Sequence, residues 1–287
     1  MTDAEGHMSW RGLWVDTSER LGDANEARWV CQEAGGLTGG EWATALEEPV
    51  GERAAARVEQ MVDRRRAGEP LQYVLGSWAF RTVELLVDRR VLIPRPETEL
   101  VAEAAIERAR AVGPTRTVVD LGTGSGAIAL ACAAELPLTG TTVWATDVSA
   151  DAIDVARANL AGIGRAGANV HVAQGSWFEA LPSELGGAVD VIVSNPPYIA
   201  DGDPEMASSV REWEPASALY AGPGGLEAIR VIAAEAPAWL RTGGSLVMEI
   251  GHRQGPAVRA LLDRLGYRDI EIRRDLAGLD RIAVART

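Results

Sequence analysis

From about residue 96 to its end, the chain alternates between segments typical of strands and segments typical of helices. Apolar runs predict strands at 117–121, 142–146, 169–173, 189–193 and 245–250, with closing strands near 270 and 282. Helical spacing predicts helices at 97–112, from 126, and at 150–161, 225–239 and 255–265. Helices that connect strands in this order place them parallel in one sheet. Residues 96–287 are therefore predicted to form a doubly wound, Rossmann-like α/β sheet.

Two shorter segments with different patterns precede this sheet. Helical spacing of apolar residues runs from Ser9 to about Gln72, as in Leu13, Ala24, Ala27, Val30 and Cys31. From Trp78 to Ile93 the pattern alternates, and a polar turn is expected at 88–90, before "VLI". The alternation places on one side of the hairpin Phe80, Val83, Leu85 and Val87. We expect a small helical domain at 1–75, a β-hairpin linker at 76–95 and the α/β domain at 96–287. Packing of the helical domain is assigned to Trp10, Trp14, Trp29 and Trp42.

Charge and composition argue against several classes of protein. The formal net charge is −13, whereas surfaces that bind nucleic-acid phosphates use clustered Lys and Arg. No apolar run reaches the roughly 18 residues of a membrane helix, and the first residues lack the basic head and apolar stretch of a secretion signal. Cys31 and Cys132 form no metal-binding pattern. We expect a cytoplasmic protein with no metal and no direct contact with membranes or nucleic acid.

Glycines lie between the first strand of the predicted sheet and the helix after it, in "VVDLGTGSGAIALACA". Glycine there allows a tight turn and a close approach of the backbone to a ligand, and nicotinamide and flavin enzymes use the same position. The G-x-G-x-G spacing after an acidic residue differs from the pyrophosphate clamp G-x-G-x-x-G. It suits a ligand without phosphates, such as S-adenosyl-L-methionine. The expected cofactor-binding residues of this loop are Asp120, Gly122, Thr123, Gly124, Ser125 and Gly126.

A second acidic residue, Asp147, ends the next strand in "VWATDVS". A carboxylate at this position can accept hydrogen bonds from both hydroxyls of a ribose. The alternative is that Asp147 caps the following helix, although Ser149 can also serve as that cap. We predict the ribose contact.

The fourth strand of the sheet ends in "VIVSNPPYI". Proline removes its own N–H and restricts the preceding residue, so the strand must end with its carbonyl groups held rigidly. Asn195 offers an acceptor and two donors, Pro196 and Pro197 offer carbonyl oxygens, and Tyr198 offers a ring face. Such a set can hold a planar NH2 group. Hydrogen bonds to Asn195 and to the Pro196 carbonyl would favour a pyramidal nitrogen whose lone pair points at a methyl sulfonium.

These motifs resemble the HemK/PrmC family, which methylates the glutamine of the GGQ motif in class I peptide-chain release factors. The similarity covers almost everything after residue 69, in the order "PLQYVLG", "VLIPRPETEL", "DLGTGSGAIALA", "TDVSADAIDVARAN", "WFEALP", "VSNPPYI", "EPASALYAGPGGL", "MEIGHRQ" and "RRDLAGLDR". The resemblance implies that S-adenosyl-L-methionine is the cofactor and that class I release factors are the protein substrate. It implies that the helical domain docks this substrate. A monomer is expected.

The resemblance also assigns roles to individual residues. It implies that the glycine loop and Asp147 bind the cofactor, that Trp177 borders its adenine, and that the NPPY residues hold the glutamine amide. We therefore assign Asn195, Pro196 and Tyr198 as catalytic, add Pro197 to the substrate site, and expect Asn195 to border the cofactor as well. The chain departs from the family at "GSWF", because Ser176 replaces the usual acidic residue. Its hydroxyl can accept a hydrogen bond from the adenine amino group, but without charge assistance.

Three alternative functions remain from the sequence. Adenine-specific nucleic-acid methyltransferases share the Asn-Pro-Pro-aromatic motif, but this chain has no basic recognition domain. A glutamine methyltransferase of a ribosomal protein would use the same chemistry, and "IPRPETE" favours the release-factor branch instead. A non-catalytic binding module would be expected to lose the glycine loop or NPPY. The histidines His7, His171 and His252 lie outside the motifs, so no general base is assigned to them.

Overall fold

The computed structural model describes residues 8–204 and 206–287, and the chain forms two compact units that divide between Ser77 and Trp78. His7 and most of the segment used to exclude a secretion signal lie outside the described residues. Within the described ranges, no helix is long and apolar enough to cross a membrane.

The first unit consists of helices, as the sequence predicts. Their bounds are α1 Trp10–Leu21, α2 Ala24–Gly35, α3 Gly39–Ala45, α4 Glu52–Arg66 and α5 Leu71–Leu75. Side chains cap three of them: Ser9 accepts from Gly12 N, Asp23 from two N–H groups of α2, and Thr38 forms a capping box with Glu41. Polar caps of this kind set where each helix begins.

Apolar side chains fill the centre of this unit. Of the predicted core residues, Leu13, Ala27, Val30 and Cys31 are buried, whereas Ala24 is exposed because it is the first residue of α2. The Trp10 and Trp42 rings meet edge to face at 6.1 Å, and both are 6% exposed. The packing role assigned to the tryptophans is weakest for Trp29, which is 38% exposed.

The second unit contains the predicted α/β sheet, with a two-stranded hairpin before it. The hairpin strands are β1 Ser77–Phe80 and β2 Val83–Leu86. The sheet strands are β3 Arg116–Leu121, β4 Thr141–Asp147, β5 Val170–Gln174, β6 Val189–Ser194, β7 Leu240–Glu249, β8 Arg268–Arg274 and β9 Asp280–Arg286. The helices are α6 Pro96–Arg110, α7 Ala127–Glu135, α8 Ala150–Gly162, α9 Ser208–Trp213, α10 Glu227–Trp239 and α11 Gly255–Arg264.

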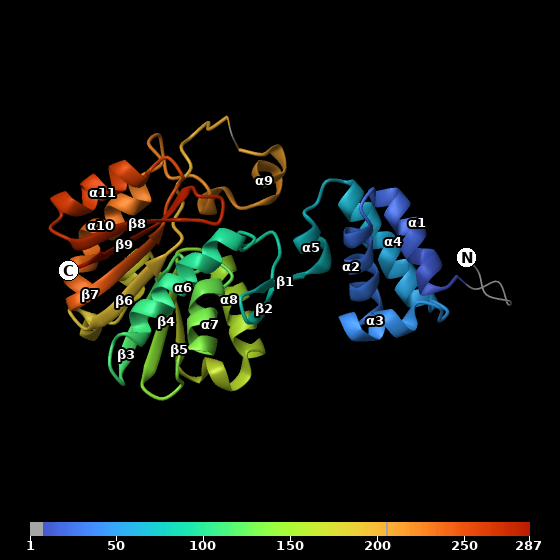
Figure 1. Ribbon diagram of the computed structural model, residues 1–287, viewed down its shortest axis with the longest axis horizontal. Helices are drawn as coiled ribbons and strands as arrows, with labels where there is room; N and C mark the ends of the chain where they lie inside the picture. The colour runs from blue at the N-terminus through green and yellow to red at the C-terminus, as the bar shows by residue number, and fades with distance from the viewer. Residues whose placement is uncertain (1–7, 205) are drawn as a thin grey trace. The chain divides into compact units, whose positions relative to one another are not determined.

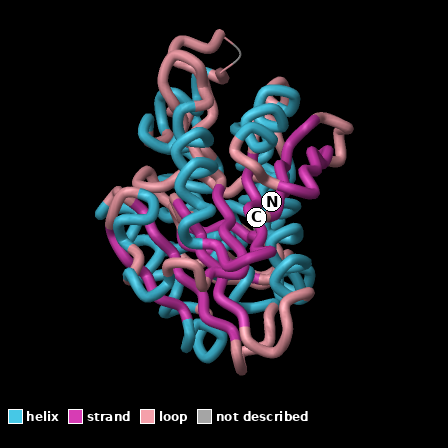
Figure 2. The backbone as a smooth tube through the Cα atoms, turned by 90° about the vertical axis from the view of Figure 1, so that its left-hand side faces the viewer, coloured by secondary structure: helices cyan, strands magenta, loops and turns pink. Residues whose placement is uncertain are grey.

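The sheet has the order β5-β4-β3-β6-β7-β9-β8. The first five strands in this order are parallel, and β9 is antiparallel to both its neighbours. Helices α6, α7 and α8 cover one face, and α10 and α11 cover the other, so the strands lie between two helical layers (Figures 1 and 2). This arrangement confirms the predicted fold class. It brings the carboxyl ends of β3, β4 and β6 together at one edge, where ligands bind in sheets of this kind.

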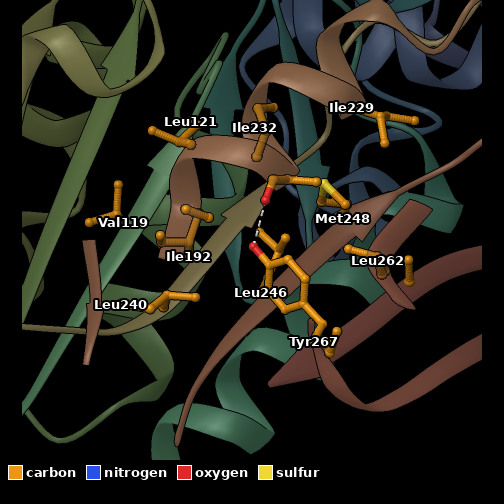
Figure 3. Close-up of a cluster of buried hydrophobic side chains, with 14 of the residues drawn as sticks. Val119, Leu121, Ile192, Ile229, Ile232, Leu240, Leu246, Met248, Leu262 and Tyr267 are labelled. Carbon is orange, nitrogen blue, oxygen red and sulfur yellow. Dashed lines mark hydrogen bonds between the residues drawn. The ribbon is translucent and has the colours of Figure 1, made fainter. Parts of the chain in front are cut away.

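Alternate residues of the central strands form the core beneath α10 (Figure 3). Val119 and Leu121 of β3 belong to the same buried cluster as Ile229 and Ile232 of α10. The cluster includes one polar group, the Tyr267 hydroxyl, which donates to the Ala233 carbonyl at 2.9 Å. A buried hydroxyl must find such an acceptor, and the helix carbonyl supplies it. This core holds the strand ends that carry the site.

The hairpin is fastened to the helices that follow the site loops. Its predicted inner residues, Phe80, Val83, Leu85 and Val87, are all buried. Asn159 of α8 accepts from Leu86 N at 2.7 Å and donates to the carbonyls of Leu86 and Ser125 at 3.0 and 2.8 Å. Arg81 donates to both carboxylate oxygens of Glu135 at 2.6 and 2.9 Å. One buried amide therefore joins the hairpin to the glycine loop.

Three details differ from the sequence prediction. The hairpin turns at Arg81 and Thr82, between β1 and β2, and not at 88–90, and residues 91–93 form no strand. Strand β7 begins at Leu240 and not at 245, and its register against β6 shifts between Val189 and Val191. The glycines at 243 and 244 hide this early start, because they interrupt the apolar pattern. Helix α9 was not predicted, since its six residues include no buried position that could reveal a helical period.

Candidate active site

An open cavity of about 1050 Å³, including solvent space at its mouth, lies at the carboxyl ends of β3, β4 and β6. Most of the predicted site residues line this cavity, namely Gly122, Thr123, Gly124, Ser125, Asp147, Ser176, Trp177, Asn195 and Pro197. Other walls come from the segment after the hairpin and from the segment after α9, including Arg90, Leu92, Pro94, Thr98, Pro215, Ser217 and Ala218.

The loop between β3 and α7 turns back toward β4. Gly122, Gly124 and Gly126 have φ of 71°, 56° and 88°, which side-chain-bearing residues rarely adopt. The Gly122 and Thr123 N–H groups both donate to the Thr146 carbonyl, at 2.8 and 2.9 Å. A Cβ atom at Gly122 would stand 3.4 Å from the Trp177 ring. The loop thus keeps its backbone open to the cavity, as a ligand that lies against the backbone requires.

Asp120 and Gly126 do not line this cavity. Asp120 is 1% exposed, and its Oδ2 accepts from the Thr123 hydroxyl at 2.6 Å and from Ala129 N at 3.1 Å. Its Oδ1 has no hydrogen-bond partner among the described residues, and burial raises the pKa of its carboxyl group to about 7. Gly126 is the residue before α7. Both residues shape the loop from beneath.

Asp147 lines the cavity and also holds the glycine loop. Its Oδ2 accepts from Gly124 N and its Oδ1 from Ser149 N, both at 2.9 Å. Burial raises the pKa of Asp147, and the backbone donors oppose that shift. The cap of α8 is Ser149, whose hydroxyl accepts from Ala152 N at 3.2 Å. Ser149, and not Asp147, is therefore the residue that caps α8. Each oxygen of Asp147 can accept a further hydrogen bond.

Ser176 and Trp177 form a wall of the cavity beside the glycine loop. Trp177 has a φ of 45°, in the left-handed region, and its carbonyl accepts from the Thr146 hydroxyl at 3.3 Å. Residues in such a conformation persist where the surroundings fix them. Here the fixed backbone places the indole against Gly122 and leaves Ser176 facing the cavity.

The NPPY segment is held at several points. Ser194 donates to the Leu121 carbonyl at 2.6 Å, which ties the end of β6 to β3. Gln254 of the "GHRQ" segment donates to the carbonyls of Tyr198 and Gly225 at 3.0 and 2.9 Å. Pro196 is buried and Pro197 lines the cavity. The predicted rigid strand end is thus fastened on both sides of the prolines.

Asn195 lies where two cavities meet. A second cavity, of about 580 Å³, is lined by Leu92, Arg95, Asn195, Tyr198, Ile199, Met206, Ala207, Val210, Ala218 and Leu219. Asn195 therefore borders the large cavity on one side and this cavity on the other. Tyr198 belongs only to the second cavity. Leu92 and Ala218 also line both cavities, so the two cavities adjoin at these three residues.

Two segments far apart in sequence form a shared wall of both cavities. Glu214, which is 6% exposed, accepts from the Arg95 guanidinium at 2.6 Å and from Ile93 N at 3.2 Å. The Arg89 guanidinium lies 4.1 Å from the centre of the Trp213 ring. Sequence reasoning assigned no role to these residues, although they fall in the quoted segments "VLIPRPETEL" and "EPASALYAGPGGL" or beside them.

Sequence reasoning also missed a buried pair behind Asn195. The Asn195 Nδ2 donates to the Thr98 hydroxyl oxygen at 3.2 Å, and the Thr98 hydroxyl donates to Glu249 Oε2 at 2.6 Å. Tyr198 donates to Glu249 Oε1 at 3.2 Å. The sequence offers one signal for this pair. Glu249 ends the apolar strand β7, where an unpaired charge would be costly, so a hydrogen-bond partner is expected for it.

Fold and site together define an S-adenosylmethionine-dependent methyltransferase. The family model described as "Methyltransferase small domain" matches residues 98–212. A solved methyltransferase from Pyrococcus furiosus superposes with a TM-score of 0.51 at 18% identity, over 80% of this chain and 96% of that one, which shows a common fold.

The comparisons at sequence level are more specific. The family model described as "PrmC N-terminal domain" matches residues 16–76. Release factor glutamine methyltransferase of Xylella fastidiosa is 44% identical over 83% of this chain and 84% of its own length. The protein of the same name from Burkholderia pseudomallei is 42% identical over 92% of both chains. The chain belongs to the release factor glutamine methyltransferase family, as the motifs predict.

Proposed function

We propose that this chain transfers the methyl group of S-adenosylmethionine to the side-chain amide nitrogen of the GGQ glutamine in class I peptide-chain release factors. The observation that carries the proposal is the position of Asn195 between the two cavities. A cofactor in the large cavity and a glutamine in the second would meet at this residue. The names of the relatives supply the substrate.

The large cavity suits S-adenosylmethionine by the chemistry of its walls. Asp147 offers acceptors for two ribose hydroxyls, and Trp177 offers a ring face for the adenine. A Cβ atom at Gly124 would meet nothing within 4 Å, which leaves room beside the end of β3. When bound, this cofactor supplies an electrophilic methyl group on a sulfonium centre. Asp120, Gly126 and Ser176 are proposed as parts of the same site, the first two through the shape of the loop.

NPPY residues prepare the amide nitrogen for transfer. The lone pair of an amide nitrogen is delocalised, so the nitrogen is a weak nucleophile. The Asn195 side chain and the Pro196 carbonyl are proposed to accept its two hydrogens, which favours a pyramidal nitrogen. Pro197 and Tyr198 are proposed to confine the substrate side chain. Transfer of the methyl group would break its bond to sulfur, leave a neutral thioether, and give an amide nitrogen that carries a positive charge and both of its hydrogens. Such a nitrogen is strongly acidic and loses one proton readily to water, so the site needs no histidine as a base.

The helical unit is proposed to dock the release factor, and the chain is proposed to act as a monomer in the cytoplasm without binding nucleic acid directly. Support comes from the match of residues 16–76 to the PrmC N-terminal domain and from the net charge of −13. If docking contributes to binding, intact release factor should have a much lower KM than a short GGQ peptide. Equal KM values would contradict the docking role.

The central experiment is a labelling assay with purified chain and S-adenosylmethionine that carries a labelled methyl group. Label should enter a class I release factor, and should disappear when the GGQ glutamine is replaced by alanine. DNA and RNA offered at low salt should stay unlabelled, because their phosphates would face an acidic protein. Label on nucleic acid with none on the release factor would establish the adenine alternative instead.

A further inference from the structure

Behind the partly buried Asn195, two buried side chains from other elements continue a chain of hydrogen bonds. Thr98 lies in the first turn of α6, Glu249 is the last residue of β7, and Asn195 follows β6. Thr98 is 3% exposed and Glu249 is 1% exposed. The bonds run from Asn195 Nδ2 to Thr98 Oγ1 at 3.2 Å and from Thr98 to Glu249 Oε2 at 2.6 Å.

We propose that Thr98 and Glu249 are positioning residues which fix the direction of the Asn195 amide, so that its oxygen and not its nitrogen is presented to the substrate. The inference rests on the proposed function, in which that oxygen accepts a hydrogen of the substrate NH2 group. Thr98 lines the wall of the large cavity, whereas Glu249 lies wholly behind it. Neither is proposed to touch the transferred methyl group.

The direction of each bond follows from the chemistry of Glu249. An ionised carboxylate can only accept, so the single Thr98 hydroxyl hydrogen is committed to Glu249. The Thr98 oxygen that faces Asn195 is then an acceptor, and only the NH2 end of the Asn195 amide can satisfy it. The amide oxygen must therefore point away from Thr98. The carboxylate thus orients the amide through one intervening hydroxyl.

Tyr198 occupies the other oxygen of the same carboxylate. Its hydroxyl donates to Glu249 Oε1 at 3.2 Å, so both oxygens of Glu249 accept from residues that border the two cavities. A glutamine at 249 would offer one oxygen and one NH2 group, and could not accept from Thr98 and Tyr198 together. The arrangement therefore needs a carboxylate, not merely a polar side chain of that shape.

The charge of Glu249 is set by groups from three sides. Burial raises its pKa to about 7, while hydrogen bonds from Thr98 and Tyr198 and the nearby Arg281 of β9 act in the opposite direction. Glu97, also on α6, adds a weaker upward shift, and Arg281 is itself paired with Asp275 at 3.3 Å. When Glu249 is neutral, its own hydrogen can be donated to Thr98, and the direction of the chain is no longer fixed.

A reversed Asn195 would bring its NH2 group against the NH2 group of the substrate. Two donors would then face each other, and the substrate nitrogen would lose the acceptor that favours its pyramidal form. Release of the constraint should lower turnover less than removal of Asn195 itself. We expect a fall of about 10- to 100-fold, the range for loss of a residue that orients a functional side chain.

The test uses three threonine variants and the full-length chain. Thr98→Val keeps the shape and removes the hydroxyl, and should lower kcat by about 10- to 100-fold. Thr98→Ser keeps the hydroxyl and should recover most of the rate. The matched control is Thr141→Val at the start of β4, a buried threonine whose hydroxyl has no partner among the described residues, which should leave kcat unchanged. The affinity for S-adenosylmethionine should stay near wild type in all three.

A second readout does not depend on turnover. The side-chain NH2 resonances of Asn195, followed by NMR without substrate, should shift as Glu249 titrates near pH 7. Thr98→Val and Glu249→Gln should each abolish this shift. A shift that persists in both variants, or a Thr98→Val enzyme with normal kcat, would overturn the positioning role. If wild type shows the shift but does not methylate the release factor, the proposed function fails while the positioning chain stands.

Discussion

Replacement of Asp147 by alanine should weaken binding of S-adenosylmethionine without unfolding the chain. The carboxylate lines the cavity and accepts from Gly124 N and Ser149 N at 2.9 Å, so each oxygen keeps a lone pair for a further donor. Loss of hydrogen bonds to a charged acceptor costs about 1.5–3 kcal/mol, which corresponds to a dissociation constant roughly 10- to 150-fold higher. Titration calorimetry at constant pH and salt measures this change.

A control residue and a modified ligand separate the two roles of Asp147. Asp151→Ala removes an exposed acidic residue from the first turn of α8 and should leave cofactor affinity unchanged. A cofactor analogue without the ribose 2′-hydroxyl should bind wild type more weakly, but should lose little further affinity with Asp147→Ala. If the two losses simply add, Asp147 does not contact that hydroxyl. Unchanged affinity of Asp147→Ala would refute the ribose contact altogether.

Three other outcomes are expected. Asn195→Ala should lower turnover by about 10²- to 10³-fold with cofactor affinity nearly unchanged, and a rate within a few-fold of wild type would remove it from catalysis. Ser176→Asp should tighten cofactor binding about 2- to 10-fold by adding charge to the adenine contact, whereas weaker binding would place the adenine elsewhere. Burial raises the pKa of Glu249 from 4.5 to about 7. Between these two pH values the folded chain keeps a proton on Glu249 that the unfolded chain has released, so stability falls as the pH rises from one to the other. Chemical denaturation should show wild type losing stability relative to Glu249→Gln between pH 4.5 and about 7, and a constant difference would contradict the raised pKa.

The order of strands and helices could be predicted from the sequence because parallel strands are continuous apolar runs. Strand β6 is buried along its whole length, and the glycines after β3 mark a turn that needs positive φ. The two site loops were found for the same reason, since each follows such a strand. Residues that act on one another from distant segments could not be found in this way.

Thr98 and Glu249 illustrate what sequence reasoning misses. They are 151 positions apart, and nothing local to either one shows that a hydroxyl of α6 meets the end of β7. Glu214 is similar, because the partners of its buried carboxylate, Arg95 and Ile93 N, lie about 120 positions earlier in the sequence. Asp120 is the opposite case. Its motif marks a ligand site, but its side chain lies beneath the loop, where it binds Thr123 and Ala129 N and does not line the cavity.

Asn159 has a consequence for where the catalytic part of this chain begins. Its single amide group binds the second hairpin strand at Leu86 and the cofactor loop at Ser125. A fragment cut at residue 96, just before α6, would remove two of the three hydrogen bonds of that amide and would strip a buried row of apolar side chains from α7 and α8. The hairpin is thus structurally part of the methyltransferase unit. Any shortened or recombined form of this enzyme has to be cut or joined before Ser77, so that the hairpin is kept.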